Sequence, residues 1–149
     1  MFSSPPHLAT RRPSAAAYAD VGASTALQAA SPHRLVSLLY EALASQIAGA
    51  RGALSRQDIP AKGRAIAHAV RIVDEGLCAP LDLARGGAIA ANLHDLYGYL
   101  VQRLTLANLR NDDAMLSECA RLAETLREGW DGIADQVQAK AAQAAQATA

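Results

Sequence analysis

The chain has 149 residues, enough for a single domain to bury a hydrophobic core without disulfides or a bound metal. Fourteen lysines and arginines balance fourteen aspartates and glutamates, so the basic excess typical of a nucleic-acid-binding protein is absent. Apolar residues make up 51% of the chain but aromatic residues only 4%, and alanine fills much of the difference. This composition favours closely packed helices over a sheet, because strands favour β-branched and aromatic side chains.

The N-terminal part of the chain is predicted to contain little fixed structure. Residues 1–13 are rich in proline and serine and are expected to be disordered, because they cannot bury enough apolar surface. Residues 14–22 predict a short helix, which is marginal alone and must be ordered by docking Tyr18 and Val21 onto the rest of the chain. No secretory signal and no run of 18 apolar residues is seen, so we expect a cytoplasmic protein without a membrane span.

Four long amphipathic helices are predicted to follow. Apolar residues recur every three or four positions in segments at 31–52, 58–80, 86–111 and 113–138. The Ala/Gln-rich tail, 139–149, carries no apolar stripe and is expected to fray. Short connections make consecutive helices antiparallel neighbours. The sequence therefore predicts an all-α fold in which residues 14–138 form an antiparallel up-down four-helix bundle with an additional short N-terminal helix.

The third long segment carries two adjacent apolar rows. The first row is Ile89, Leu93, Leu96, Leu100, Leu104 and Ala107, and the second is Ala90, Tyr97, Val101 and Leu104. One stripe buries against one neighbour, whereas two adjacent stripes need two neighbours or a partner from outside. Tyr97 and Tyr99 suit either a core edge or a protein interface. We expect Ile89, Leu93, Leu96 and Leu100 in the core, and Tyr97 and Val101 at a binding surface.

The sequence offers no residues for an enzyme reaction or a metal centre. None of the four histidines follows a glutamate by three positions, and there is no Cys-x-x-Cys and no phosphate-binding loop. Cys78 and Cys119 fall on apolar helix faces and are expected to be buried small hydrophobes. The pair Gly86-Gly87 is interpreted as a turn. We therefore expect no catalytic residue, cofactor or metal.

Positive residues gather around the first helix–helix turn. They are Arg51, Arg56, Lys62, Arg64 and Arg71. One interpretation is a solvated face that complements helix ends, and the other is a docking patch for an acidic partner.

Several short motifs give the chain a family resemblance over residues 15–137. Their order is Ala15-x-x-Tyr18, Ala30-Ser31-Pro32-His33, Gly86-Gly87-x-Ile89-Ala90-x-Asn92-Leu93, Ala107-Asn108-x-x-Asn111-Asp112 and Leu126-Arg127-Glu128-x-Trp130. Through these motifs the chain resembles the FliS-type flagellar export chaperones. The resemblance implies a cytoplasmic helical bundle that binds the C-terminal segment of flagellin, prevents premature filament assembly and helps deliver flagellin to the export gate protein FlhA. It also matches Tyr18 to the family's tyrosine needed for flagellin binding, whereas Ala15 stands where many members have a larger apolar residue.

A disordered client must be ordered as it binds, so it requires a long apolar surface instead of a single pocket. The candidate partner-binding residues are Ala15, Tyr18, Val21, Leu38, Tyr97 and Val101. The short helix at 14–22 is expected to cover part of this surface in the free chain and to move when the client binds. The alternative function is a self-associating structural or adaptor bundle, which uses its second stripe to form a homodimer and has no flagellin client.

Overall fold

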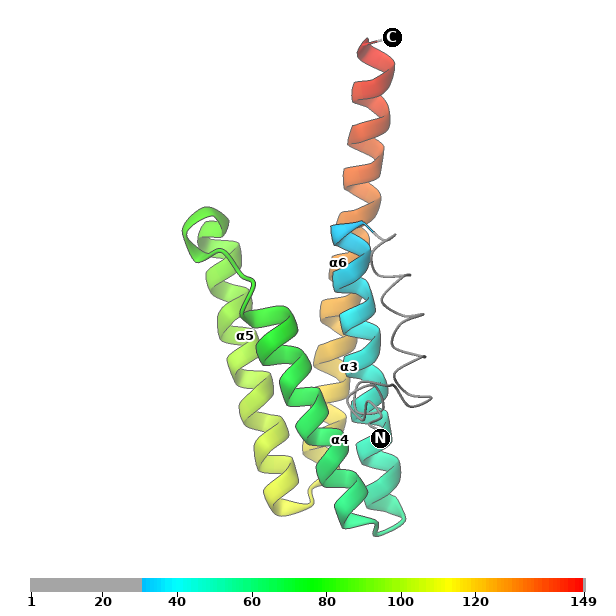
Figure 1. Ribbon diagram of the computed structural model, residues 1–149, viewed down its shortest axis with the longest axis vertical. Helices are drawn as coiled ribbons and strands as arrows, with labels where there is room; N and C mark the ends of the chain where they lie inside the picture. The colour runs from blue at the N-terminus through cyan, green and yellow to red at the C-terminus, as the bar shows by residue number, and fades with distance from the viewer. Residues whose placement is uncertain (1–30, 149) are drawn as a thin grey trace, which may run out of the picture. The chain divides into compact units, whose positions relative to one another are not determined.

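The computed structural model describes residues 31–148, and the side chains of residues 31–133 and 142–147. Its elements are α3 (Pro32–Ser55), α4 (Ile59–Arg71), the π-helix η1 (Ile72–Cys78), α5 (Leu83–Arg110) and α6 (Asp113–Thr148). The described residues contain no strand, so the predicted all-α class is confirmed (Figure 1). The short N-terminal helix predicted at 14–22 lies outside the described residues.

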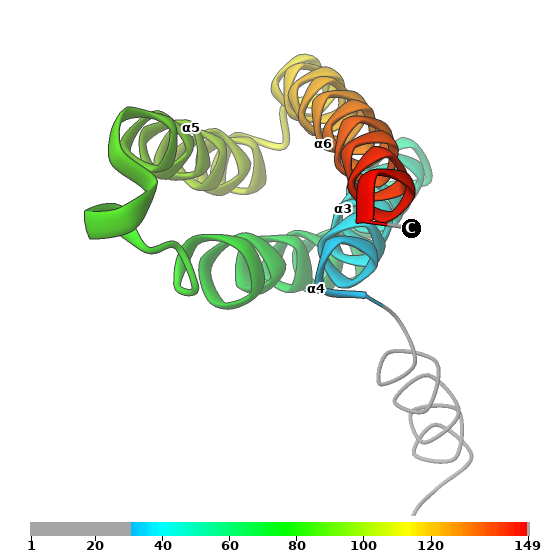
Figure 2. The same cartoon turned by 90° about the horizontal axis from the view of Figure 1, so that it is seen from above.

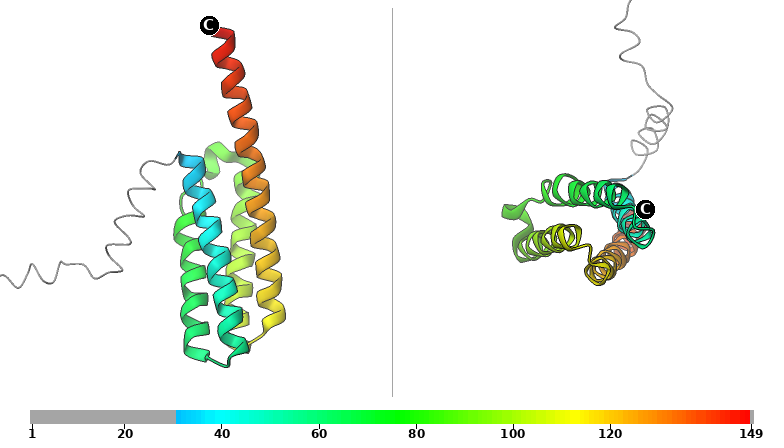
Figure 3. Two further views of the ribbon diagram at one scale, coloured as in Figure 1. Left: turned by 90° about the vertical axis from the view of Figure 1, so that its right-hand side faces the viewer. Right: turned by 90° about the horizontal axis from the view of Figure 1, so that it is seen from below.

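The long helices run alternately up and down and pack into a four-helix bundle (Figures 1 and 3). Helix α4 passes directly into η1, so the two form one continuous rod. Helix α5 packs against this rod on one side and against α6 on the other. Helices α3 and α6 are joined by a hydrogen bond from Ser37 to Asp131 (3.1 Å) and by an ion pair between Arg51 and Asp113 (2.9 Å). The predicted antiparallel bundle is therefore confirmed.

Each long helix begins at a side-chain cap. Ser31, Asp58, Asp82 and Asp112 each accept a hydrogen bond from the backbone N–H three residues later, at 3.0–3.2 Å. Such caps satisfy N–H groups that have no partner inside the helix, and each contributes about 1 kcal/mol. The helix starts predicted near residues 31, 58 and 113 are confirmed, whereas α5 begins at Leu83, before the predicted residue 86.

The Gly86-Gly87 pair bends the start of α5. Gly87 has φ +57° and ψ −136°, a conformation that side chains with a Cβ rarely adopt, and it separates a first turn from the main helix. A Cβ on Gly86 would lie only 2.4 Å from the Cβ of Ala90. Both glycines are therefore needed for the bend, as the predicted turn requires.

The hydrophobic core contains residues from every long helix. Its fully buried large side chains are Tyr40, Leu43, Ile47, Ile66, Val73, Leu100, Leu104, Leu116 and Cys119. Lys62 is also buried, at 3% exposure, and its Nζ donates to the backbone oxygen (2.8 Å) and to Oδ1 (2.7 Å) of Asn108. These hydrogen bonds fasten the start of α4 to the end of α5.

The π-helix η1 is a feature that the sequence does not predict. Its wider turn is closed by the N–H of Ala79, which donates to the oxygen of Asp74 at 2.9 Å. Within η1, Val73 and Leu77 are buried, and Gly76 lies so close to Leu39 of α3 that an added Cβ would stand 3.2 Å from its methyl carbons. The widened turn thus brings the end of this rod tightly against α3.

Candidate functional site

The large apolar side chains of α5 are more exposed in its N-terminal half than in its C-terminal half. Leu104 and Leu100 are fully buried and Leu93 is half-buried, whereas Leu96 is 38% and Ile89 is 74% exposed. The expectation that Ile89 and Leu96 belong to the core is therefore wrong. Figures 1 and 2 show that α5 diverges from α3 and α6 toward this end, and within residues 31–133 these two side chains stay exposed.

Helix α6 shows the same change at the same end of the bundle. Leu116, Cys119 and Ala123 are buried, Trp130 is half-buried, and Ile133 is 48% exposed. Helices α5 and α6 are antiparallel neighbours, so the N-terminal half of α5 and the 126–133 region of α6 lie at one end. Large apolar side chains of both helices are thus exposed toward this end, and exposed apolar surface that is contiguous marks interaction sites.

Two adjoining hollows open at this end, with volumes of about 450 and 160 Å³. They share Leu81 and Leu93, so we treat them as one site, the open-end cleft. Its lining residues are Val36, Gly76, Leu77, Pro80, Leu81, Asp82, Arg85, Gly86, Ile89, Ala90, Leu93, Tyr97 and Trp130. The cleft therefore draws on α3, η1, α5, α6 and the η1–α5 connection.

The lining of the open-end cleft is mostly apolar. Its two charged residues, Asp82 and Arg85, are exposed and lie 3.8 Å apart as an ion pair. Deeper in the cleft, the hydroxyl groups of Tyr97 and Tyr40 form a hydrogen bond of 2.5 Å. Burial raises the pKa of both phenols, and the hydrogen bond shared with Tyr40 raises the pKa of Tyr97 further, so both stay neutral. Such a lining accepts aliphatic and aromatic side chains.

The residues proposed from the sequence for partner binding occupy different environments. Tyr97 is only 3% exposed and contributes to the inner wall of the open-end cleft instead of an outer surface. Val101 is half-buried against the core, and Leu38 is half-buried on α3 outside both hollows. Ala15, Tyr18 and Val21 lie outside the described residues.

Sequence reasoning missed several residues of this site. Ile89 is predicted for the core but lines the cleft, Leu93 lines the cleft while packing against the core, and the predicted binding residues do not include Leu81, Val36 or Trp130. Helical spacing shows that Ile89 and Leu93 share a face, but it contains no signal for the divergence of α5 that leaves Ile89 exposed.

Other chemistry is sparse in the described part of the chain. No group of three His, Cys, Asp or Glu side chains there is arranged to hold a metal ion. Cys78 and Cys119 are free thiols, and burial raises the pKa of both, that of Cys119 to about 11. None of the described helices combines the length and the hydropathy needed to cross a bilayer.

Comparison with known proteins gives a consistent result. The sequence profile of a family described as flagellar protein FliS matches residues 14–137. The flagellar secretion chaperone FliS of Salmonella typhimurium is 43% identical over 117 residues, covering 78% of this chain and 87% of that protein. The flagellar secretion chaperone FliSB of Pseudomonas aeruginosa is 42% identical over 116 residues, covering 78% and 91%.

A more distant relative extends the same match. The flagellar secretion chaperone FliS of Bacillus subtilis is 29% identical over 101 residues, covering 68% of this chain and 74% of that protein. The profile match includes every segment that lines the open-end cleft. The chain therefore belongs to the flagellar protein FliS family.

Proposed function

We propose that this chain is a flagellar export chaperone that binds the C-terminal segment of flagellin in the open-end cleft. In the cytoplasm it would keep that segment from polymerising prematurely and assist its delivery to the export gate protein FlhA. The general class is supported by the relatives, which carry the name flagellar secretion chaperone. To this general class the proposal adds the C-terminal segment of flagellin as the client, FlhA as the export gate, and the cytoplasm as the compartment.

The observation that carries the proposal is the uncovered apolar stripe at one end of an otherwise well-packed bundle. Ile89, which lines the open-end cleft, is 74% exposed, and toward the same end of the bundle Leu96 of α5 is 38% and Ile133 of α6 is 48% exposed. A client that is disordered when free gains most from a long apolar surface, because each buried aliphatic side chain offsets part of the ordering entropy. The open-end cleft supplies an apolar surface to which α3, η1, α5 and α6 all contribute.

The chain contains a direct reporter of binding. Trp130 is its single tryptophan, and it lines the open-end cleft. A flagellin C-terminal peptide titrated into the full chain should shift the emission of Trp130 to shorter wavelength, because the indole moves into a drier environment. Calorimetry under the same conditions should give saturable heat. No saturable heat and no inhibition of flagellin polymerisation would contradict the proposal.

A pair of matched variants tests the location of the site. Ile89 and Leu109 lie on the same helix and are similarly exposed, at 74% and 77%, but toward opposite ends. Ile89→Ser should weaken binding of the peptide roughly tenfold or more, since burying one aliphatic side chain is worth about 1.5–3 kcal/mol. Leu109→Ser should leave the affinity unchanged. Equal effects of the two substitutions would show that the peptide does not bind in the open-end cleft.

The role of Tyr18 stays a prediction from the family resemblance. Tyr18→Ala should weaken peptide binding with little change in melting temperature, whereas a large drop in melting temperature would make Tyr18 a core residue.

Sedimentation of the isolated chain distinguishes the chaperone function from the alternative, a self-associating bundle. A tight homodimer that ignores the flagellin peptide would favour a self-associating bundle over a chaperone.

A further inference from the structure

The cations that cluster around the first helix–helix turn divide into two groups in the structure. Arg51 forms an ion pair with Asp113 at 2.9 Å, and the buried Lys62 donates both of its hydrogen bonds to Asn108. These two residues hold the bundle together. The three that stay exposed are Arg56, Arg64 and Arg71.

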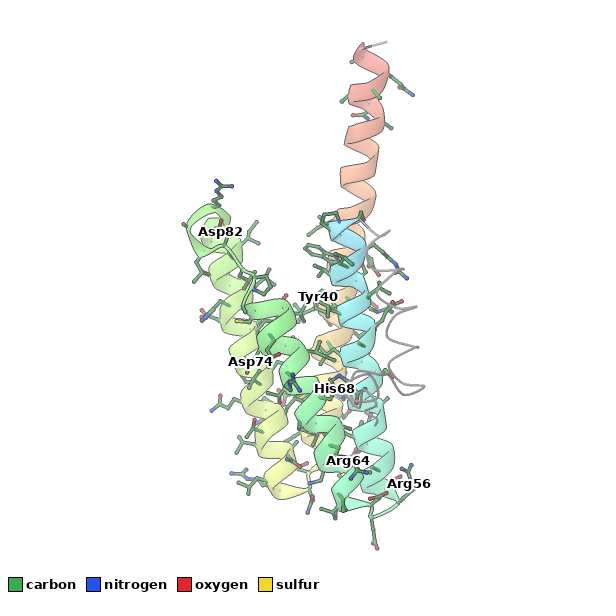
Figure 4. All side chains as sticks on the ribbon, viewed as in Figure 1. Tyr40, Arg56, Arg64, His68, Asp74 and Asp82 are labelled. Carbon is green, nitrogen blue, oxygen red and sulfur yellow. The ribbon has the colours of Figure 1, made fainter. Side chains whose placement is uncertain are left out.

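A fourth basic residue joins the exposed group. Arg64, His68 and Arg71 follow each other at spacings of four and three, so they share one face of α4, a helix without any acidic residue. Among the described residues, neither Arg64 nor His68 has an ion pair or a side-chain hydrogen bond. Arg71 pairs with Glu75 at 3.3 Å, but both side chains are about two-thirds exposed or more, so this pair is weak. Figure 4 shows Arg64 and His68 on α4, and Arg56 at the turn that precedes this helix.

A shallow hollow of about 350 Å³ adjoins this row of cations. It is lined by Leu39, His68, Arg71, Ile72, Glu75 and Gly76. Leu39 is half-buried and Ile72 is buried, so they form the apolar part of the lining. The charged and basic part is exposed and consists of His68, Arg71 and Glu75. The hollow shares only Gly76 with the open-end cleft, so the two sites present different surfaces. We call the hollow and the row Arg56, Arg64, His68 and Arg71 together the basic face.

We infer that the basic face docks an acidic segment of a second protein, separate from the client in the open-end cleft. Carboxylates of that segment would pair with Arg64 and Arg71, and an adjacent aliphatic side chain would enter the hollow over Leu39 and Ile72. Charged groups at an interface rim set the association rate and the choice of partner more than the affinity. Such a surface suits a partner that must recognise the chaperone transiently while its cleft is occupied.

Two other anionic partners fit the basic face less well. Binding to an anionic membrane surface requires an apolar helix face that can enter the bilayer, but Ile66 and Ala69 of α4 are buried in the core. Binding to nucleic acid requires a longer track of cations than these four residues provide, and the chain as a whole has no net charge. An acidic protein segment needs only a few cations beside an apolar hollow.

The test uses a fluorescein-labelled peptide of Glu-Glu-Leu repeats and the full chain, with and without bound flagellin peptide. Fluorescence anisotropy at low salt should show saturable binding in both states and weaker binding at high salt. Arg64→Ser combined with Arg71→Ser should weaken it about fivefold or more, the sum of two exposed ion pairs. Arg110→Ser combined with Arg121→Ser removes the same charge from other exposed positions and should leave binding unchanged.

Several results would overturn the inference. These are no saturable binding, equal losses in the two double variants, equal binding of a Gln-Gln-Leu peptide, and tighter binding of anionic phospholipid vesicles or duplex DNA than of the acidic peptide. The inference stands apart from the proposed function, because the Arg64/Arg71 variant should bind the flagellin peptide with unchanged affinity. Displacement of the acidic peptide by flagellin peptide would show a single shared surface and also overturn it.

Discussion

The hydroxyl oxygens of Tyr40 and Tyr97 lie 2.5 Å apart in the core, where the two side chains are 2% and 3% exposed. This hydrogen bond joins α3 to α5 beside the open-end cleft. Each phenol is the other's side-chain partner, so the pair satisfies polar groups that burial would otherwise leave without water. Tyr97, which belongs to the second apolar row of α5, is therefore used to hold the bundle together at the site.

The Tyr40–Tyr97 pair should show strong coupling in a double-mutant cycle. Tyr97→Phe leaves the hydroxyl of Tyr40 buried without its partner, and should lower the free energy of unfolding by about 1–3 kcal/mol. Adding Tyr40→Phe should recover much of this loss, because both polar groups are then absent. Urea denaturation of the two single variants and the double variant measures the coupling. Strictly additive losses would contradict a mutual hydrogen bond.

The two glycines Gly86 and Gly98 should respond oppositely to alanine. A Cβ on Gly86 would stand 2.4 Å from the Cβ of Ala90, so Gly86→Ala should destabilise the chain by about 1–3 kcal/mol and distort the cleft. Gly98 has open space around it in mid-helix, and Gly98→Ala should stabilise the chain by about 0.5–1 kcal/mol. Thermal melting decides the signs, and a stable Gly86→Ala variant would disprove the close approach at that turn.

The buried Lys62 should depend on its acceptor. Asn108→Ala removes one of the two oxygens that bind the ammonium group, and should cost about 1.5–3 kcal/mol because the bond is to a charged group. Lys62→Met removes the charge together with its need for partners, and should cost less. Chemical denaturation compares the two variants. A larger loss in Lys62→Met than in Asn108→Ala would show that the ammonium group itself stabilises the fold.

Stability should fall in acid partly through Glu118. Hydrogen bonds from Tyr99 and then from Arg103 hold the pKa of Glu118 below its ordinary value of 4.5. Because the folded-state pKa is the lower one, the stabilisation is present above pH 4.5 and is lost as the pH falls through the folded-state pKa.

Glu118→Gln should therefore flatten the fall of melting temperature below about pH 4.5. Glu128→Gln, at an exposed position on the same helix, is the control and should keep the slope of the parent chain. Parallel melting curves for the Glu118→Gln variant and the parent chain at acid pH would contradict a role for this carboxylate.

Much of the fold follows from the sequence because its causes are local. Ser31, Asp58 and Asp112 cap helices through a backbone N–H only three residues away, so the helix starts could be predicted from short motifs. The stripes of 86–111 and 113–138 correctly indicated amphipathic helices, and the short connections indicated an antiparallel bundle. The π-helix at 72–78 was missed, because its pattern of apolar residues differs little from that of an α-helix.

Which part of a stripe is buried was decided only by the tertiary structure. Ile89, Leu96 and Leu100 share one helix face, yet their exposure runs from 74% through 38% to 0%. Helical periodicity determines the direction in which a side chain points, but burial also requires a neighbouring helix at the right distance. The divergence of α5 from α6 removes that neighbour at one end. This divergence explains why Ile89, which was predicted for the core, is exposed and can contribute to the proposed client site.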